Sequence, residues 1–200
     1  ANTLTIASIN AVAQTYAGAI SGTGDLIKTG LALQTLSGTN TFTGKVTVGL
    51  PGDTHQGGLS ITGTTSITGA TVNAGTLTVA HTTVTSPMTI SGAVNVNGGA
   101  FIMGLSTTTT GTNTINGTLT LSNAGTASFP STQTTALSNI TGAVTLNNAS
   151  SFSAAGRVTI GGLVDVKDFA SFSVALATAN NTFTGGMQVG PSATVSLAGN

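Results

Sequence analysis

Two aspartates, Asp165 and Asp168, are the only closely spaced carboxylates in the sequence that could act as a pair. Two carboxylates held at a fixed separation can serve as general acid and base in glycoside cleavage. Asp165 occupies an outward position of an expected strand that ends at Val166, and Asp168 falls in the turn that follows. Lys167 lies between them as a local counter-charge. We therefore interpret the pair as a solvated bend and assign no catalytic residue.

The two histidines, His55 and His81, are separated by close to the length of one sequence repeat. They could therefore lie near each other on adjacent coils, with Asp53 as the only supplementary ligand. A structural zinc site uses four ligands and a catalytic site usually three. We interpret these residues as ordinary loop positions and predict neither a metal nor a cofactor.

Other reactive constellations lack their components. The chain has no Cys, no Gly-Gly-x-Gly-x-Asp calcium motif, and no His after position 81 that could serve a serine nucleophile in the later half. Ice-binding solenoids present Thr-x-Thr pairs on one flat face, but the pairs in this sequence do not recur at one position of the repeat. We interpret them as outward strand positions filled according to β-propensity: they are Thr3 with Thr5, Thr76 with Thr78, and Thr118 with Thr120.

The composition excludes several classes of partner. Only four residues are basic and four acidic, so 4% of the chain is charged, against roughly 25% in a typical soluble domain. Binding to nucleic acid or to an anionic membrane needs clustered Lys and Arg, and no apolar run approaches the roughly 20 residues of a membrane helix. The start of the chain lacks signal-peptide features. We expect a mature product or an excised piece that neither binds nucleic acid nor inserts into a membrane.

A glycine recurs in one short frame, with an apolar residue two places before it and usually apolar residues two and four places after. Its regular spacing along the chain is typical of stacked supersecondary units. Apolar residues alternate after the glycine, which indicates strands. The frame glycines are Gly22 (a partial copy), Gly44, Gly69, Gly92, Gly117, Gly142, Gly162 and Gly185.

Turn-forming residues follow each frame glycine by five or six places, and an apolar residue returns after ten. The turn pairs are Asn97–Gly98, Ser122–Asn123, Asn147–Asn148, Lys167–Asp168 and Gly190–Pro191, and the returning residues are Val79, Ile102, Phe152, Phe172 and Val195. Three short strands and three bends then make one coil. The sequence predicts an all-β, right-handed parallel β-helix, a β-solenoid of about eight coils of roughly 23 residues each. We expect a single domain, with 1–40 as an irregular first coil or cap and 41–200 as repeated coils.

Two segments leave alternatives open. Residues 11–20 could form a helix, although Gly18 and the β-rich sequence that follows favour a strand or turn equally. Glycines at every sixth position from Gly57 to Gly75 hint at a left-handed hexapeptide helix within 54–89. We expect six of the seven phenylalanines to occupy or adjoin inward positions rather than form a sugar-binding platform, and Tyr16 receives no role; the six are Phe42, Phe129, Phe152, Phe169, Phe172 and Phe183.

The stretch TYAGAISGTGDLIKTGLALQTLSGTNTFTGKVTVG, residues 15–49, resembles the passenger-associated repeat of autotransporter proteins, and residues 179–197 look like a partial second copy. In place of the usual GTLTL after the KTG, this chain has LALQTL. The resemblance implies a secreted right-handed parallel β-helix that forms part of a surface protein. TLSNAGTASFPS and TLNNASSFSAAGRVTIGG also look like bacteriophage tail-fibre repeats.

The sequence therefore predicts a non-enzymatic, extracellular structural protein, a building block of a surface filament, surface layer or adhesin stalk. Exposed strand edges and low charge predict self-association, end to end or lateral, and a cell-surface or carbohydrate receptor is a further candidate partner. A homotrimeric phage tail-fibre shaft is the alternative. A polysaccharide-binding or polysaccharide-cleaving β-helix is third.

Overall fold

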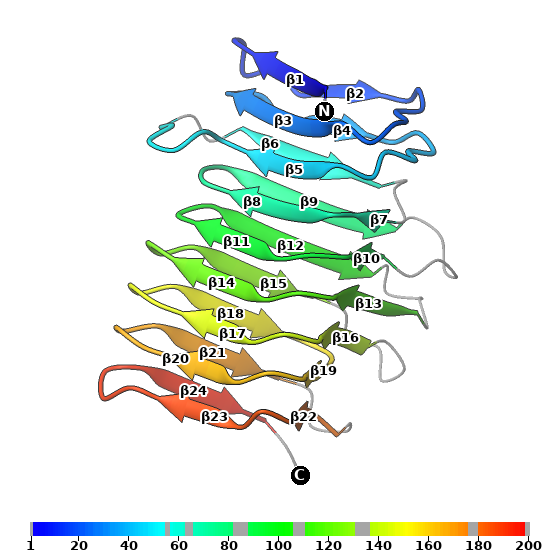
Figure 1. The fold of residues 1–200 in the computed structure, drawn as a ribbon. Helices are drawn as coiled ribbons and strands as arrows, with labels where there is room; N and C mark the ends of the chain where they lie inside the picture. Colours follow the sequence, from blue (N-terminus) through cyan, green and yellow to red (C-terminus); the bar gives the residue numbers. More distant parts are fainter. Residues whose placement is uncertain are drawn as a thin grey trace.

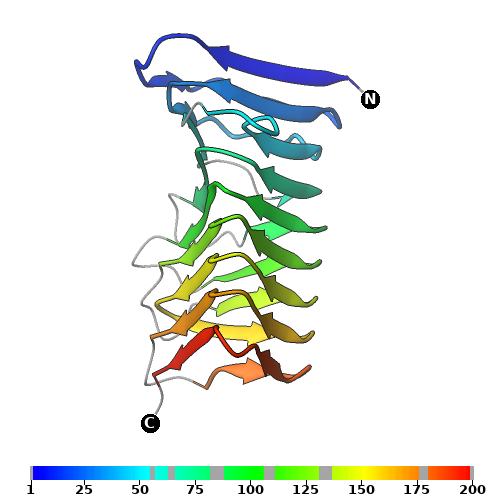
Figure 2. The ribbon, with the colours of Figure 1, turned by 90° about the vertical axis from the view of Figure 1, so that its left-hand side faces the viewer.

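The computed structural model describes residues 2–54, 57–62, 66–81, 88–105, 111–130, 137–175 and 180–198, and at positions 81 and 105 the backbone alone. All regular structure in these ranges is β-strand. Three parallel sheets run along the stack, and the chain winds through them coil after coil (Figures 1 and 2). The chain forms a parallel β-solenoid, as the alternation and the repeat predict.

Two of the sheets have nine strands each and the third has six. Sheet A contains β1 (Thr3–Ser8), β3 (Asp25–Gly30), β5 (Lys45–Val48), β8 (Gly69–Val72), β11 (Val94–Asn97), β14 (Leu119–Ser122), β17 (Val144–Leu146), β20 (Val164–Val166) and β23 (Met187–Val189). Sheet B contains β2 (Gln14–Tyr16), β4 (Gln34–Leu36), β6 (Gly58–Ile61), β9 (Thr76–His81), β12 (Ala100–Leu105), β15 (Thr126–Phe129), β18 (Ser151–Ala154), β21 (Ser171–Val174) and β24 (Thr194–Leu197). Sheet C contains β7 (Ser66–Ile67), β10 (Thr89–Ile90), β13 (Thr112–Ile115), β16 (Leu137–Ile140), β19 (Arg157–Ile160) and β22 (Thr182–Phe183).

The coil is right-handed. In Figure 1 the strands of sheet A lie in front and run to the left, those of sheet B return behind them to the right, and the chain descends from N-terminus to C-terminus. Paired residues in sheet A are one repeat apart, as in Leu26 with Val46 and Val94 with Leu119. Sheets A and B have nine strands each, which agrees with the predicted eight coils to within one.

The segment 1–40 contributes β1 to β4, which belong to sheets A and B, whereas sheet C begins at β7. The segment 11–20 holds the short strand β2, so the helical alternative is wrong there. The segment 54–89 holds β6 to β9, which join the same three sheets as the strands above and below them. The left-handed hexapeptide alternative is wrong in its handedness, because β6, β7, β8 and β9 pass through sheets B, C, A and B in the same order as the other coils. The pairing of Gly58 with Thr76 nevertheless makes this coil 18 residues long, a multiple of six.

The frame glycines lie at the corner between sheets C and A, where neighbouring backbones come too close for a side chain. A Cβ added to Gly142 would lie 2.6 Å from the carbonyl oxygen of Gly117, and one added to Gly162 would lie 2.5 Å from the nitrogen of Ala143. Neither Gly142 nor Gly162 has a positive φ, so the constraint on these two is the close approach and not the conformational freedom of glycine. We call this set the glycine column.

Two of the eight predicted frame positions are wrong by one or two residues. Gly24, not Gly22, is stacked against Gly44, because the lead-in of that coil is two residues longer than the frame. Thr68, not Gly69, precedes the paired strand in the next coil, since Gly69 pairs with Lys45 and Thr68 donates its N–H to the carbonyl of Gly44.

Inward side chains form columns that fill the centre of the coil. In sheet A the columns contain Val46, Val72 and Leu121, all fully buried. Phenylalanine rings stack behind sheet B: the centroids of Phe152 and Phe172 are 4.6 Å apart with their planes 10° from parallel. Contacts between neighbouring rings continue the stack to Phe129 and Phe101 on one side and Phe183 on the other. This ladder gives sheet B a rigid inner face.

The turn from sheet A to sheet B requires left-handed backbone. Asn148 and Ala149 have φ angles of 53° and 57°, and the equivalent pairs Asn123–Ala124 and Asp168–Phe169 adopt the same conformation. Turns therefore occur where the sequence predicts them in these coils, but each left-handed pair begins one residue later than the predicted pair. The earlier turn at Asn97 is one residue shorter, because Ala100 pairs with Thr126 while Asn97 pairs with Ser122.

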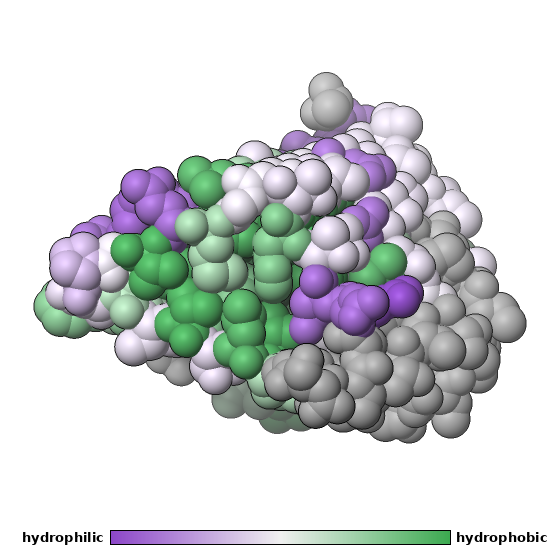
Figure 3. Space-filling model, turned by 90° about the horizontal axis from the view of Figure 1, so that it is seen from below, coloured by the Kyte–Doolittle hydropathy of each residue, from purple (hydrophilic) through white to green (hydrophobic). Residues whose placement is uncertain are grey.

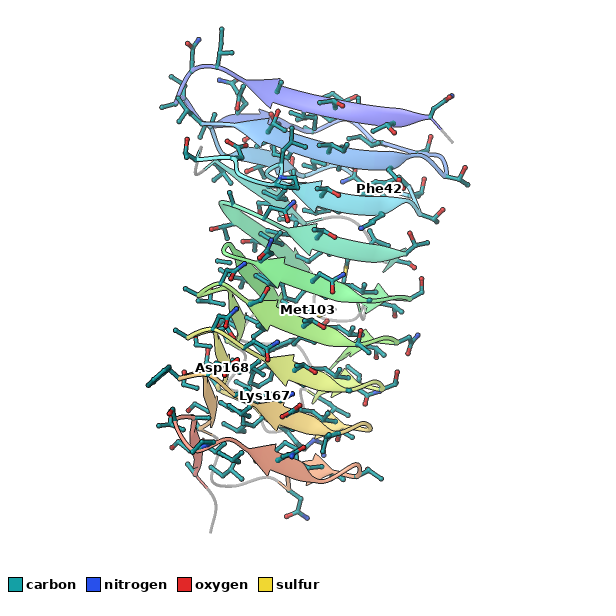
Figure 4. All side chains as sticks on the ribbon, turned by 60° about the vertical axis from the view of Figure 1, so that its left-hand side comes forward. Phe42, Met103, Lys167 and Asp168 are labelled. Carbon is teal, nitrogen blue, oxygen red and sulfur yellow. The ribbon has the colours of Figure 1, made fainter. Side chains whose placement is uncertain are left out.

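The shorter turn corrects one predicted core residue. Ile102 faces outward and is half-buried, whereas its neighbours Phe101 and Met103 are buried. Removing one residue from a turn moves every following side chain to the opposite face of the strand. Figure 4 labels Met103 and Phe42, both inside the coil, and Lys167 and Asp168 at the turn.

We predict that Gly142→Ala destabilises the stack by roughly 1–3 kcal/mol, because its methyl group has no space beside Gly117 and overpacking has that cost. Gly104→Ala is the matched control, since a Cβ there lies 3.7 Å or more from any atom beyond its two chain neighbours. The measurement is chemical unfolding followed by circular dichroism. Equal losses in the two variants would contradict the close-approach argument.

Candidate functional site

Asp165 and Asp168 occupy the places that the sequence predicts. Asp165 points outward from β20, and its Oδ2 is 2.6 Å from Nζ of Lys167, so the carboxylate is neutralised locally. The Asp165 side chain is 14% exposed, while Lys167 is 49% exposed. Asp168 lies in the left-handed turn beyond β20 and is exposed. The two carboxylates thus belong to a surface bend.

The histidine set falls largely outside the described residues. His55 is among the positions that the structure leaves undescribed, and the side chain of His81 is as well, although its backbone ends β9. Asp53 lies in the loop after β5. Within the described ranges no cluster of three His, Cys, Asp or Glu residues is placed to hold a metal ion.

The Thr-x-Thr pairs are divided between two sheets. Thr5 and Thr120 face outward in the same column of sheet A, which runs from Thr5 through Ile27, Thr47, Thr71, Asn95, Thr120, Thr145 and Asp165 to Gln188. Isoleucine, asparagine and aspartate interrupt this column. Thr76 and Thr78 lie on sheet B instead.

Phe169 does not follow the core prediction. Its side chain is 76% exposed at the turn after β20, with φ of 62°. In this coil the last inward residue of sheet A is Val166 and the first inward residue of sheet B is Phe172. Phe169 lies in the turn between these two strands and belongs to neither alternating pattern. Phe42, Phe129, Phe152 and Phe172 are buried as expected, and Phe183 is partly buried against the core.

Lys28 is a buried cation that the sequence analysis missed. Its side chain is 1% exposed and occupies an inward position of β3, in register with Ile6 on β1. Nζ donates hydrogen bonds to the carbonyl oxygens of Thr29 (2.7 Å) and Gly30 (3.4 Å) and to Oγ of Ser8 (3.1 Å). The signal was the alternation itself, since Leu26 and Lys28 share one face of the strand.

Burial lowers the pKa of the Lys28 ammonium group, and the charge of Asp53 acts in the opposite direction. Ser8, Thr29, Gly30 and Asp53 also line a surface groove of about 600 Å³, whose walls include Leu31, Leu50 and Pro51. The three acceptors of Lys28 lie at the ends of β1 and β3, where the chain turns from sheet A to sheet B. We therefore interpret Lys28 as a residue that stabilises the first two A–B turns.

Three asparagines that precede the glycine column were also missed as structural residues. Asn40, Asn113 and Asn181 each stand four positions before a frame glycine, and each accepts a backbone N–H from the preceding coil. The donors are Ile20 (3.0 Å), Met88 (3.3 Å) and Val158 (2.9 Å). The signal was the recurring Asn-Thr-(Phe or Ile)-x-Gly pattern. Each of these amides links two neighbouring coils beside the glycine column.

The geometry defines a class of protein, the parallel β-solenoid with a continuous core and an almost uncharged surface. No helix that could span a bilayer occurs in the described part of the chain. Comparisons with protein-family models, with curated proteins and with solved structures find no match to the chain.

We predict that Asn113→Ala costs about 1–3 kcal/mol of unfolding free energy, because it leaves the Met88 N–H buried without its acceptor. Asn116→Ala, at an exposed position of the same coil, is the control and changes stability little. Denaturant titration measures both. If Asn113→Ala leaves the free energy of unfolding unchanged, the Asn113 amide does not stabilise the contact between coils.

The Lys28 site predicts a pH dependence of stability. A lysine whose folded-state pKa is lowered binds fewer protons folded than unfolded at pH values between that pKa and its ordinary value of about 10.4, so stability rises with pH through this window. Tyr16, the only Tyr in a chain without Trp, reports by its fluorescence on the first coils. The Tyr16-detected denaturation midpoint should increase as the pH rises toward the ordinary lysine pKa of about 10.4, and Lys28→Met should remove the increase. An equal slope in Lys28→Met would assign the effect to other groups.

Proposed function

We propose that this chain is a non-enzymatic, extracellular structural protein whose coils stack end to end on further coils, as a building block of a surface filament, surface layer or adhesin stalk. The observation that carries the proposal is the uninterrupted repeat of strands in sheets A and B, because each coil presents a face on which a further coil can stack, whether it belongs to the same chain or to another copy. The low charge of the surface and the local neutralisation of Asp165 add support.

The lower end presents apolar side chains of the inward columns. Val189 and Leu197 are 47% and 49% exposed, and Phe183, Met187 and Val195 are partly buried against the core. Figure 3, which views this end of the stack, shows a contiguous hydrophobic area bordered by polar residues. Among the described residues, β23 and β24 each have one neighbour in their sheet, so a further strand could pair with the other edge of each.

The upper end presents matching columns. Leu4 on β1 and Tyr16 on β2 are 46% and 49% exposed, and both face the coil interior. With Ile6, Ile20, Gln34 and Leu36 they surround a hollow of about 360 Å³. A further coil placed in parallel register would set Leu4 and Ile6 against Met187 and Val189.

Contact between a lower and an upper end is heterologous, because two different surfaces meet, and it does not close on itself. Such contacts propagate into filaments. Few charged residues oppose the approach of two copies. The resemblance of residues 15–49 to autotransporter passenger repeats supports placement at a cell surface, while the tail-fibre alternative predicts a fixed trimer.

The test substitutes Val189→Asp together with Leu197→Asp, which places charge on the apolar end. We expect the unmodified chain to form rods longer than one molecule by electron microscopy and to sediment as a concentration-dependent series, and the double variant to sediment as a monomer. Gln188→Asp with Ser196→Asp is the matched control, because these outward neighbours lie on the same two strands.

Two results would contradict end-to-end stacking. One is an unmodified chain that stays monomeric at high concentration, and the other is equal assembly of the end-face variant and its control. A stable trimer that survives dilution would favour the tail-fibre shaft instead. Far-UV circular dichroism checks that each variant retains its β-structure.

A further inference from the structure

The outer face of sheet B carries a two-column array of hydroxyl groups that the sequence pattern did not reveal. Four consecutive strands, β15, β18, β21 and β24, each present two outward residues, and all eight are Ser or Thr. The columns are Thr126, Ser151, Ser171 and Thr194, and Ser128, Ser153, Ser173 and Ser196. Because the pairs are Thr-x-Ser and Ser-x-Ser, a search for Thr-x-Thr does not find them.

The same two columns continue toward the N-terminus with one interruption. Thr76 and Thr78 of β9 are in register with Ala100 and Ile102 of β12, and these with Thr126 and Ser128. Ten of twelve outward positions over six strands therefore carry a hydroxyl group, and β12 supplies both exceptions. Ile102 faces outward because of the shorter turn, and its large apolar side chain therefore interrupts the column that contains Thr78 and Ser128.

The spacing of the array is set by the sheet. Adjacent strands lie about 4.8 Å apart, and residues i and i+2 of one strand lie about 6.7 Å apart, so the hydroxyl groups form a regular two-dimensional net. Every one of the eight residues from β15 to β24 is partly or fully exposed. Among the hydrogen bonds recorded within the described residues, none engages these hydroxyl groups, which leaves them available to an external lattice.

The face is uncharged and rigid. Along the described strands of sheet B no residue is Lys, Arg, Asp or Glu, whereas sheet A carries Asp25, Lys45 and Asp165 outward. Directly behind the array lie the stacked rings of Phe129, Phe152 and Phe172. A stiff inner ladder holds the outward side chains at a constant height, so less entropy is lost when they bind.

We propose that this face of sheet B binds ice. The surface of ice is a neutral, periodic net of water oxygens with spacings of the same order as those of the array. Both the protein face and the ice surface are uncharged. This favours contact, because a charged side chain would retain hydration water that does not fit the ice lattice. Each hydroxyl donates and accepts hydrogen bonds, so it can take the place of a lattice water.

A glycan chain fits this face less well. Sugar recognition commonly adds aromatic platforms, and among the described outward positions from β6 to β24 in sheet B none is aromatic. The proposal is independent of end-to-end stacking, because the array lies on the side of the rod and each copy carries a complete one.

The experiment measures thermal hysteresis of the purified chain, which is the gap between the melting and freezing temperatures of a single ice crystal. We expect a gap that grows with protein concentration, and faceted crystals. Ser153→Tyr, at the centre of the array, should lose most of the gap. Thr145→Tyr is the matched control, since it is an outward position of sheet A in the same coil, and it should retain the gap.

A gain-of-function variant provides a second criterion. Ala100→Thr with Ile102→Thr fills the break in β12 and should enlarge the gap at equal concentration. The proposal is overturned if the unmodified chain shows no hysteresis, or if Ser153→Tyr and Thr145→Tyr lose it equally. Retention of the chain on insoluble cellulose but not on ice, with dependence on Ser153, would show that the face binds a glycan lattice and would also overturn it.

Discussion

The close approach of backbone to backbone at the corner between sheets C and A is the constraint on which the rest of the structure depends. At Gly142 and Gly162 the neighbouring coil occupies the space where a side chain would be. This contact brings successive coils to sheet spacing at one defined point, and parallel pairing then extends from it into sheet A. The buried columns of sheet A take their register from that point, and the length of the A–B turn then decides which residues of sheet B join the phenylalanine ladder and which join the hydroxyl columns.

Parallel stacking in register also explains the scarcity of charge. Each residue has an equivalent residue about 4.8 Å above and below it, so a repeated charge would repel its own copies along the whole column. The few charges that do occur are isolated or balanced. Asp165 lies between Thr145 and Gln188 in its column and pairs with Lys167, and the Asp25 carboxylate accepts the backbone N–H of Lys45 on the next coil. Thr, Ser and Asn carry no such penalty when they are repeated.

The alternation of apolar residues predicted the fold class, the coil length and most of the core, because period-two patterns depend only on local geometry. It failed where the number of residues in a turn changes. Gly22 and Gly69 were misplaced by small differences in lead-in length, and Ile102 was assigned to the wrong face after a turn shortened by one residue. The hydroxyl columns of sheet B involve several coils, so they depend on pairing between distant residues and could not be predicted without the register.

The two ends of the described chain lie at opposite ends of the stack (Figure 1), and this has a mechanical consequence. Tension applied between the termini acts across the hydrogen bonds of one terminal coil at a time, so the rod yields by peeling and not by a single cooperative rupture. Each coil of about 23 residues releases roughly 75 Å of extended chain. A protein built in this way can lengthen stepwise under load while the remaining coils keep their shape.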